Sequence, residues 1–70
     1  MTTIEIQHIQ STIDYLRKCA ADGHKLEARH KAAGNLDLEN WFQGRANGFE
    51  DAARWLERDL KFFSQSIDAA

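Results

Sequence analysis

Apolar residues in the first half of the chain recur at alternating steps of three and four. They are Ile6, Ile9, Ile13, Leu16 and Ala20. This spacing puts them on one stripe of a helix, which is typical of a helix packed lengthwise against another. Thr2 and Glu5 have the spacing of a capping box, in which the hydroxyl accepts from the third helical amide. The pattern therefore predicts a helix that begins at about residue 3.

Gly23, preceded by Asp22, is the first place where this helix could end. The residues after it, 25–33, are mostly good helix formers, and a glycine inside a helix costs about 1 kcal/mol relative to alanine. Leu26 falls off the apolar stripe, so either the helix bends near Gly23 or it has a second apolar side. We expect the helix to continue, and a bend at Gly23 remains open.

The second boundary is clearer. Gly34 suits the left-handed position that ends a helix, Asn35 tolerates a turn, and Asp37 is a good N-cap for a second helix. The predicted elements are a first helix over residues 3–33, a turn over residues 34–37 and a second helix over residues 38–66.

The second helix carries two apolar rows. The first row can pack against the first helix and consists of Leu38, Phe42, Phe49, Leu56, Leu60, Phe63 and Ile67. The second row recurs every seven residues and consists of Trp41, Gly48, Trp55 and Phe62. A hairpin can bury only one of these rows against its own partner helix, so the other needs cover from another chain.

These elements predict an all-α protein, an antiparallel helical hairpin that forms a single domain over residues 1–70. The absence of valine and proline fits helix throughout. Basic residues are in excess over 17–31 and acidic residues over 37–59, and folding the hairpin sets these segments side by side. Because 70 residues give a small core, we expect a homo-oligomer, most simply an antiparallel dimer that forms a four-helix bundle.

Charge and cysteine content exclude some classes of function. The net charge is −2, so no overall field draws the chain onto nucleic acid. The single cysteine, Cys19, excludes an internal disulfide and a cysteine-based zinc site. No signal peptide and no apolar run long enough to span a bilayer is visible. We expect a cytoplasmic protein with no membrane contact.

Gly44 and Gly48 place two glycines four residues apart inside the strongest helix, with Ala52 one turn further. Two interior glycines cost about 2 kcal/mol of helix stability in total, which close approach by another helix or by a ligand could offset. Packing against another helix is the favoured interpretation.

Arg45 is placed by its spacing on the first apolar row, between Phe42 and Phe49. An unpaired guanidinium is costly there, so we expect a carboxylate partner from the first helix, such as Glu27. The alternative is that Arg45 points toward an anionic ligand or an acidic partner protein.

A compact cationic segment precedes the turn. It contains His24, Lys25, Arg29, His30 and Lys31. In an oligomer, copies of Lys25, Arg29, His30 and Lys31, with Arg45, could converge on a phosphate or nucleotide, while Trp41 or Tyr15 stacks on a base. The favoured interpretation is a solvated helix face matched by acidic residues opposite.

Metal binding and catalysis have less support. Two Glu-x-x-His pairs, Glu5/His8 and Glu27/His30, have the spacing used in di-iron bundles, but these pairs are too far apart along one helix to share an ion. Cys19 lacks an orienting third group and an oxyanion element, so we expect no enzyme, no metal and no cofactor.

Residues 38–60, LENWFQGRANGFEDAARWLERDL, resemble the helical segment of many short phage and prophage accessory proteins. In those segments an aromatic residue, a Gly-Arg-Ala-like step and an acidic, alanine-rich amphipathic stretch follow one another. The resemblance implies a phage-encoded protein that acts in the host cytoplasm and binds host machinery, including the anti-defence class that blocks CRISPR effectors or captures signalling nucleotides.

The function that the sequence favours is that of a non-enzymatic protein-interaction module that inhibits a host protein. Its association face consists of Trp41, Gly44, Gly48, Trp55 and Phe62. Whether this face serves self-association or a foreign protein stays open. The alternatives are an oligomeric binder of a small anionic ligand or nucleotide and, as a third, a DNA-associated regulatory accessory protein.

Overall fold

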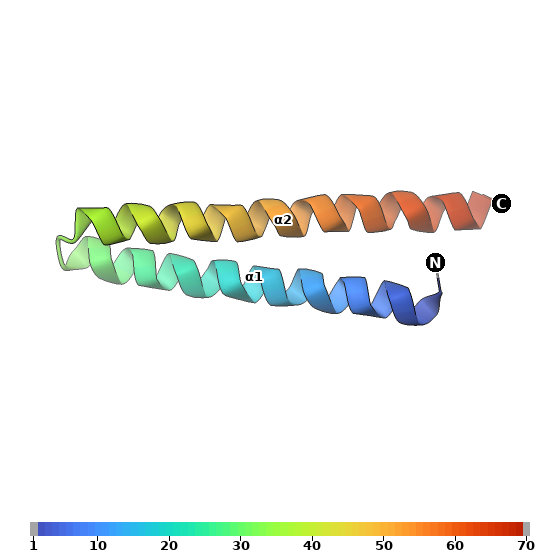
Figure 1. Ribbon diagram of the computed structural model, residues 1–70, viewed down its shortest axis with the longest axis horizontal. Coiled ribbons are helices and arrows are strands. Elements are labelled where there is room, and N and C mark those ends of the chain that lie inside the picture. The colour runs from blue at the N-terminus through green and yellow to red at the C-terminus, as the bar shows by residue number, and fades with distance from the viewer. Residues whose placement is uncertain (1, 70) are drawn as a thin grey trace.

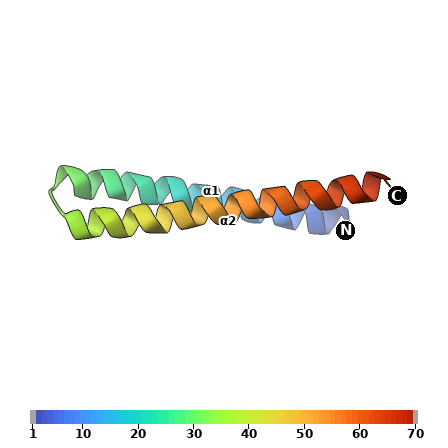
Figure 2. The same cartoon turned by 90° about the horizontal axis from the view of Figure 1, so that it is seen from above.

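Two long helices lie side by side in opposite directions and form the whole fold (Figures 1 and 2). The computed structural model describes the backbone of residues 2–69 and the side chains of residues 2–63. Helix α1 spans Thr3–Ala32 and helix α2 spans Leu36–Ala69. The predicted all-α antiparallel hairpin is confirmed, and α1 runs through Gly23 without a break.

The ends of α1 follow their sequence signals. The Thr2 hydroxyl accepts from the Glu5 amide at 3.1 Å and caps the helix. At the other end Gly34 has φ +78°, its amide donates to the Lys31 carbonyl, and the Asn35 amide donates to the His30 carbonyl. These two bonds form a Schellman motif, which satisfies carbonyls that the end of a helix leaves unpaired.

The start of α2 differs from the prediction. The helix begins at Leu36, two residues before the expected Leu38, and the Asn35 carbonyl accepts from the Glu39 amide at 2.9 Å. The predicted Asp37 cap is therefore wrong, because Asp37 already lies in the first helical turn. There its carboxylate is well placed for the positive end of the helix dipole.

The seam between the helices is built from small residues. Ala20 and Gly23 of α1, and Ala46 and Ala53 of α2, are all buried. A Cβ added to Gly23 would lie 3.0 Å from the Cβ of Ala46, so the two backbones approach as closely here as a glycine allows. Gly23 is thus a packing position inside α1.

The apolar stripe of α1 faces α2 as predicted, with Ile13 fully buried and Ile6, Ile9 and Leu16 half-buried. The first row of α2 needs correction. Its seam positions step 42, 46, 49, 53, 56 and 60, which brings in Ala46 and Ala53 and leaves some predicted members outside.

Leu38 and Phe63 are the predicted members of the first row that lie outside the seam. Leu38 is 45% exposed and Phe63 is 51% exposed. Leu38 lies in the first turn of α2, at the end of the hairpin, and Phe63 is rotated away from the line of Ala53 and Leu60. The side chain of Ile67, also predicted in this row, lies outside the described residues.

The hairpin has far more surface than its mass suggests. It measures 55 × 16 × 11 Å, and its radius of gyration is 16.0 Å, whereas a compact domain of this length has about 11 Å. Its accessible surface is 5377 Å², about 900 Å² more than the roughly 4,450 Å² typical of a folded monomer of this mass. A single hairpin therefore leaves much of its apolar surface uncovered.

Candidate functional site: an aromatic side and an outer row

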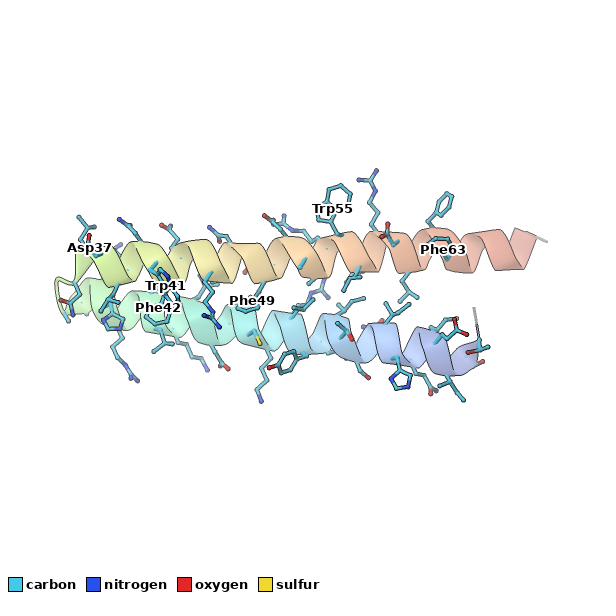
Figure 3. All side chains as sticks on the ribbon, in the orientation of Figure 1. Asp37, Trp41, Phe42, Phe49, Trp55 and Phe63 are labelled. Carbon is cyan, nitrogen blue, oxygen red and sulfur yellow. The ribbon has the colours of Figure 1, made fainter. Side chains whose placement is uncertain are left out.

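One broad side of the hairpin, which we call the aromatic side, carries a groove between the two helices. The groove has a volume of about 410 Å³ and is lined by Cys19, Asp22, Gly23, Leu26, Trp41, Phe42, Arg45 and Phe49. Figure 3 shows Trp41, Phe42 and Phe49 along this side, over the region where the helices meet. Because small residues occupy the buried centre of the seam, these rings lie across its edge, where Phe42 and Phe49 are half-buried and Trp41 is exposed.

Stacked rings cross the aromatic side from α1 to α2. His30 of α1 stacks on Phe42 with ring centroids 5.4 Å apart, and Trp41 meets Phe42 edge-on at 4.9 Å. The Arg45 guanidinium lies 5.1 Å from the Trp41 ring and 5.5 Å from the Phe49 ring. Cation–π attraction at such distances holds Arg45 along the surface.

The predicted environment of Arg45 is wrong. Arg45 is exposed, because Ala46 and not its neighbour faces α1. Glu27, the expected partner, instead accepts a hydrogen bond from His24. Within residues 2–63 no carboxylate pairs with Arg45, and its partners are the two aromatic rings.

The predicted association face is the second surface of interest, and we call it the outer row. Its members are Trp41, Gly44, Gly48, Trp55 and Phe62. All five are exposed, Trp41 by 54% and Trp55 by 64%. Trp55 points away from α1 in Figure 3.

The outer row is not one continuous groove. Trp41, Gly44 and Gly48 line a shallow depression of about 700 Å³, and a Cβ added to either glycine would meet nothing within 4 Å. Trp55 lines a separate depression of about 260 Å³, where the Arg58 guanidinium lies 5.8 Å from its ring. Phe62 packs edge-on against Phe63.

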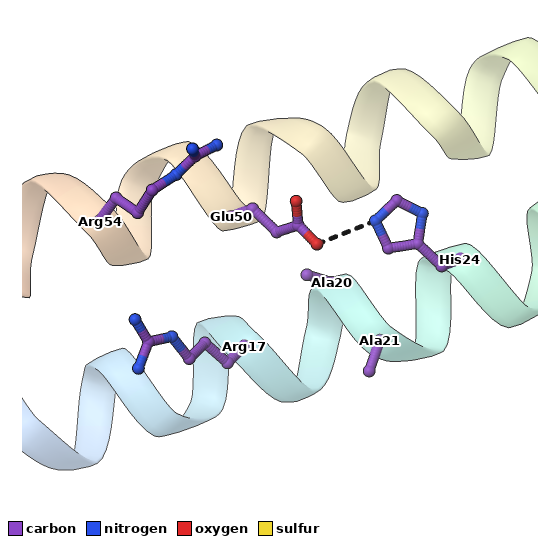
Figure 4. Close-up of a pocket in the computed structure, with 6 residues that line it drawn as sticks. All are labelled: Arg17, Ala20, Ala21, His24, Glu50 and Arg54. Carbon is purple, nitrogen blue, oxygen red and sulfur yellow. Dashed lines mark hydrogen bonds and ion pairs between the residues drawn. The ribbon is translucent and has the colours of Figure 1, made fainter.

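The opposite broad side, which we call the ionic side, closes on itself (Figure 4). His24 of α1 lies between two carboxylates, with Nδ1 2.9 Å from Glu27 and Nε2 2.9 Å from Glu50 of α2. Arg17 pairs across the helices with Glu57, and Arg54 pairs with Asp51. The groove on this side, about 500 Å³, is thus lined by cations that already have partners.

The geometry around His24 favours its charged form. Both ring nitrogens can donate to a carboxylate only when the imidazole is protonated. The pKa of His24 is raised from 6.5, chiefly by the hydrogen bond with Glu27 and next by that with Glu50. When protonated, this side chain forms a cationic bridge between α1 and α2.

Tyr15 and Cys19 lie one turn apart on α1, at the edge of the aromatic side. Tyr15 is 66% exposed. Its pKa is raised, first by a hydrogen bond with the Cys19 side chain and then by charge interaction with that group. The phenol is therefore neutral at physiological pH and acts there as a hydrogen-bonding group.

The predicted anion-binding residues do not gather within one chain. Lys25, Arg29 and Lys31 are exposed along α1, and the side chains of Arg29 and Lys31 point to different sides of the helix. His30 is held against Phe42, and Arg45 is held on α2 by its two rings. Among the described residues, no three histidine, cysteine or carboxylate side chains are arranged to hold a metal ion.

Sequence reasoning did not bring the groove residues together. It placed Leu26 off the apolar stripe of the first helix and Phe49 in the first apolar row of the second helix. The structure joins these residues into one surface with Trp41 and Arg45. The signal in the sequence was Leu26, because its displacement from the stripe of α1 marks the side of α1 that carries the groove.

The chain matches no family model, no curated protein and no solved structure. Over the part of the chain that the structure describes, neither helix combines the length and the apolar character that crossing a membrane requires.

Proposed function

We propose that this chain is a non-enzymatic protein-interaction module that binds a partner protein through the outer row. The observation that carries the proposal is the exposure of two tryptophans, Trp41 at 54% and Trp55 at 64%, on a helix whose other side already packs against α1. Contiguous apolar surface on a folded protein marks interaction sites, and here Trp41 lines one depression with Gly44 and Gly48 while Trp55 lines another with Arg58.

The chemistry of the outer row fits this role. Tryptophan and arginine are the residue types most enriched among those that dominate binding energy, and Arg58 lies over Trp55. Gly44 and Gly48 leave an open strip of backbone beside Trp41, into which a side chain of a partner could fit. An amphipathic helix that presents such a row is suited to a hydrophobic groove on another protein.

The sequence pattern of residues 38–60 resembles that of phage accessory proteins, so the partner we expect is a host protein that the chain inhibits. A nucleotide-binding role has less support in a single chain, because the cationic residues are dispersed and Arg45 is stacked between rings. A role on DNA has less support because the net charge is −2.

The proposal is tested by affinity capture from lysate of the host cells, with the immobilised wild-type chain, the Trp55→Ala variant and the Leu36→Ala variant. Leu36 is a matched control, since it is 65% exposed at the start of α2 and lies outside the outer row. We expect one protein to be retained by the wild type and by Leu36→Ala, with roughly tenfold or greater loss for Trp55→Ala. Equal retention by all three variants, or no enriched protein, would contradict the proposal.

A further inference from the structure

We infer that the aromatic side is covered by a second copy of this chain, in a two-fold dimer whose turns lie at the same end. This inference deepens the proposed function, which it takes as its premise. It divides the exposed apolar surface between two occupants. The groove side, which includes Trp41, serves self-association, and the part of the outer row around Trp55 serves the partner protein.

The surface area supports a second copy as the occupant. The hairpin exposes about 900 Å² more than a folded monomer of its mass, and a standard protein interface removes about 800 Å² from each partner. Its only fully buried large side chain is Ile13, among the residues whose side chains are described. Covering one broad side would bring both the core and the exposed area into the range of a stable small protein.

The position of the groove selects the arrangement of the two copies. The groove spans residues 19–26 of α1 and 41–49 of α2, so it lies in the half of the hairpin nearer the turn. A two-fold axis parallel to the helices places the two grooves against each other while the two hairpins overlap along their full length. An axis perpendicular to the helices, with full overlap, would instead set each groove against the open end of the other copy. We therefore assign the parallel axis, which puts α1 against α2 of the partner subunit.

The charges of the groove are self-complementary. Asp22 and Arg45 are its only charged lining residues, and neither makes an ion pair within residues 2–63. They lie at the same level along the hairpin, because their neighbours Gly23 and Ala46 are in contact. With the axis parallel to the helices, Asp22 therefore meets Arg45 of the partner subunit, and the symmetry repeats this pair.

This balance also separates the second copy from other occupants. The groove carries one acid, Asp22, and one base, Arg45. A strongly acidic or strongly basic partner would therefore be attracted by one of these groups and repelled by the other. A purely apolar partner would bury both charged groups without partners, which is costly. A copy of the same chain supplies one acid and one base in the reverse order, so both groups are paired.

The experiment is sedimentation equilibrium over a micromolar concentration series. The variants are Asp22→Lys, Arg45→Glu and the double variant that carries both changes. We expect the wild type to have twice the 8.0 kDa mass of the chain. Each single reversal should raise the dissociation constant about tenfold or more, because the like-charge contact occurs twice in the dimer. The double variant should return to within about threefold of the wild type, because each pair is restored with its signs exchanged.

Two variants serve as matched controls. Arg58→Glu removes an arginine that also lies over a tryptophan, and Asp14→Lys reverses an exposed acid of α1 that bonds to Gln10. Both should leave the dimer intact. Circular dichroism of every variant checks that the helices are retained.

Several results would overturn the inference. A monomeric wild type would show that no second copy covers the aromatic side. A mass above that of a dimer would contradict the two-fold pair. If Arg45→Glu and Arg58→Glu weakened the dimer equally, the assigned contact between Asp22 and Arg45 would be wrong. It would also be wrong if the double variant dimerised no more tightly than the single variants. The capture experiment tests the outer row independently of the dimer. If the wild type were a monomer but Trp55→Ala still abolished capture of the partner protein, the proposed function would be retained.

Discussion

The two broad sides of this hairpin use the same pair of helices in opposite ways. On the ionic side, charged groups of α1 find their partners on α2, as His24 does with Glu50 and Arg17 does with Glu57. On the aromatic side, Asp22 and Arg45 line one groove and stay unpaired within the described residues. The ionic side therefore sets the register of the hairpin, whereas the aromatic side is available for a second molecule.

The close packing of the seam explains why one side of this small protein is aromatic and exposed. Gly23 lets the backbones of α1 and α2 approach closely, so the fully buried positions described between them hold alanines and one isoleucine besides Gly23 itself. Larger rings are therefore displaced to the surface. Close packing of the seam and exposure of the aromatic residues have the same cause.

Widening the seam should have the largest effect on stability. Gly23→Leu places a side chain against Ala46, where even a Cβ would be at 3.0 Å, so we expect the free energy of unfolding to fall by about 2 kcal/mol or more. The matched variant Gly44→Leu meets nothing within 4 Å and should gain up to about 1 kcal/mol from helix propensity. Urea unfolding at one fixed protein concentration measures both values. A neutral Gly23→Leu would show that the close contact is not needed.

Truncating one tryptophan at a time separates the aromatic side, which includes Trp41, from the part of the outer row around Trp55. Trp41 lines the groove, so Trp41→Ala should weaken the dimer by about 2 kcal/mol, or roughly 30-fold in dissociation constant. Trp55 lies in a separate depression, so Trp55→Ala should change that constant by less than about threefold. Light scattering over a dilution series measures both. Dissociation by Trp55→Ala alone would assign self-association to the outer row.

Raising the pH should weaken the ionic side. The folded-state pKa of His24 is raised above 6.5 by Glu27 and Glu50, so its stabilising contribution is complete below about pH 6.5 and is lost as the pH rises through the folded-state value. We expect the melting temperature of the wild type to fall over that range and the fall to be smaller in His24→Gln. His8→Gln, which replaces an exposed histidine of α1, should keep the wild-type profile. Identical dependence of the melting temperature on pH in all three proteins would contradict a stabilising bridge from His24 to Glu27 and Glu50.

Alkylation of Cys19 should give the smallest effect, without any substitution. Cys19 is half-buried in the groove, so a second copy over the aromatic side should shield it further. The alkylation rate per molecule should fall by a few-fold as the protein concentration rises through the dissociation constant. A rate independent of concentration, over a range in which the mass changes, would place Cys19 outside the interface.

Local signals in the sequence predicted the helices well. Thr2 and Glu5 marked the start of α1, and Gly34 marked its end, because each capping motif depends on residues close in the chain. The start of α2 was two residues wrong because Asp37 is favourable both as a cap and in the first turn.

Burial was harder to predict because it depends on the other helix. The spacing alone favoured Arg45 for the buried row, since the large residues Phe42 and Phe49 flank it. In the structure Ala46 takes that place, because the approach at Gly23 admits only a small side chain there. The groove was missed for the same reason, since it needs the register between α1 and α2, which the cross-helix pairs of His24 and Arg17 define.

The distance between the two turns of the dimer tests the central claim most directly. A spin label attached through Asp37→Cys, in a Cys19→Ala background, reports this distance by pulsed dipolar spectroscopy. With turns at the same end we predict roughly 20 to 30 Å, since neighbouring helices in a bundle lie about 10 Å apart. A distance near the 55 Å length of the hairpin, or no dipolar coupling between chains, would contradict the account.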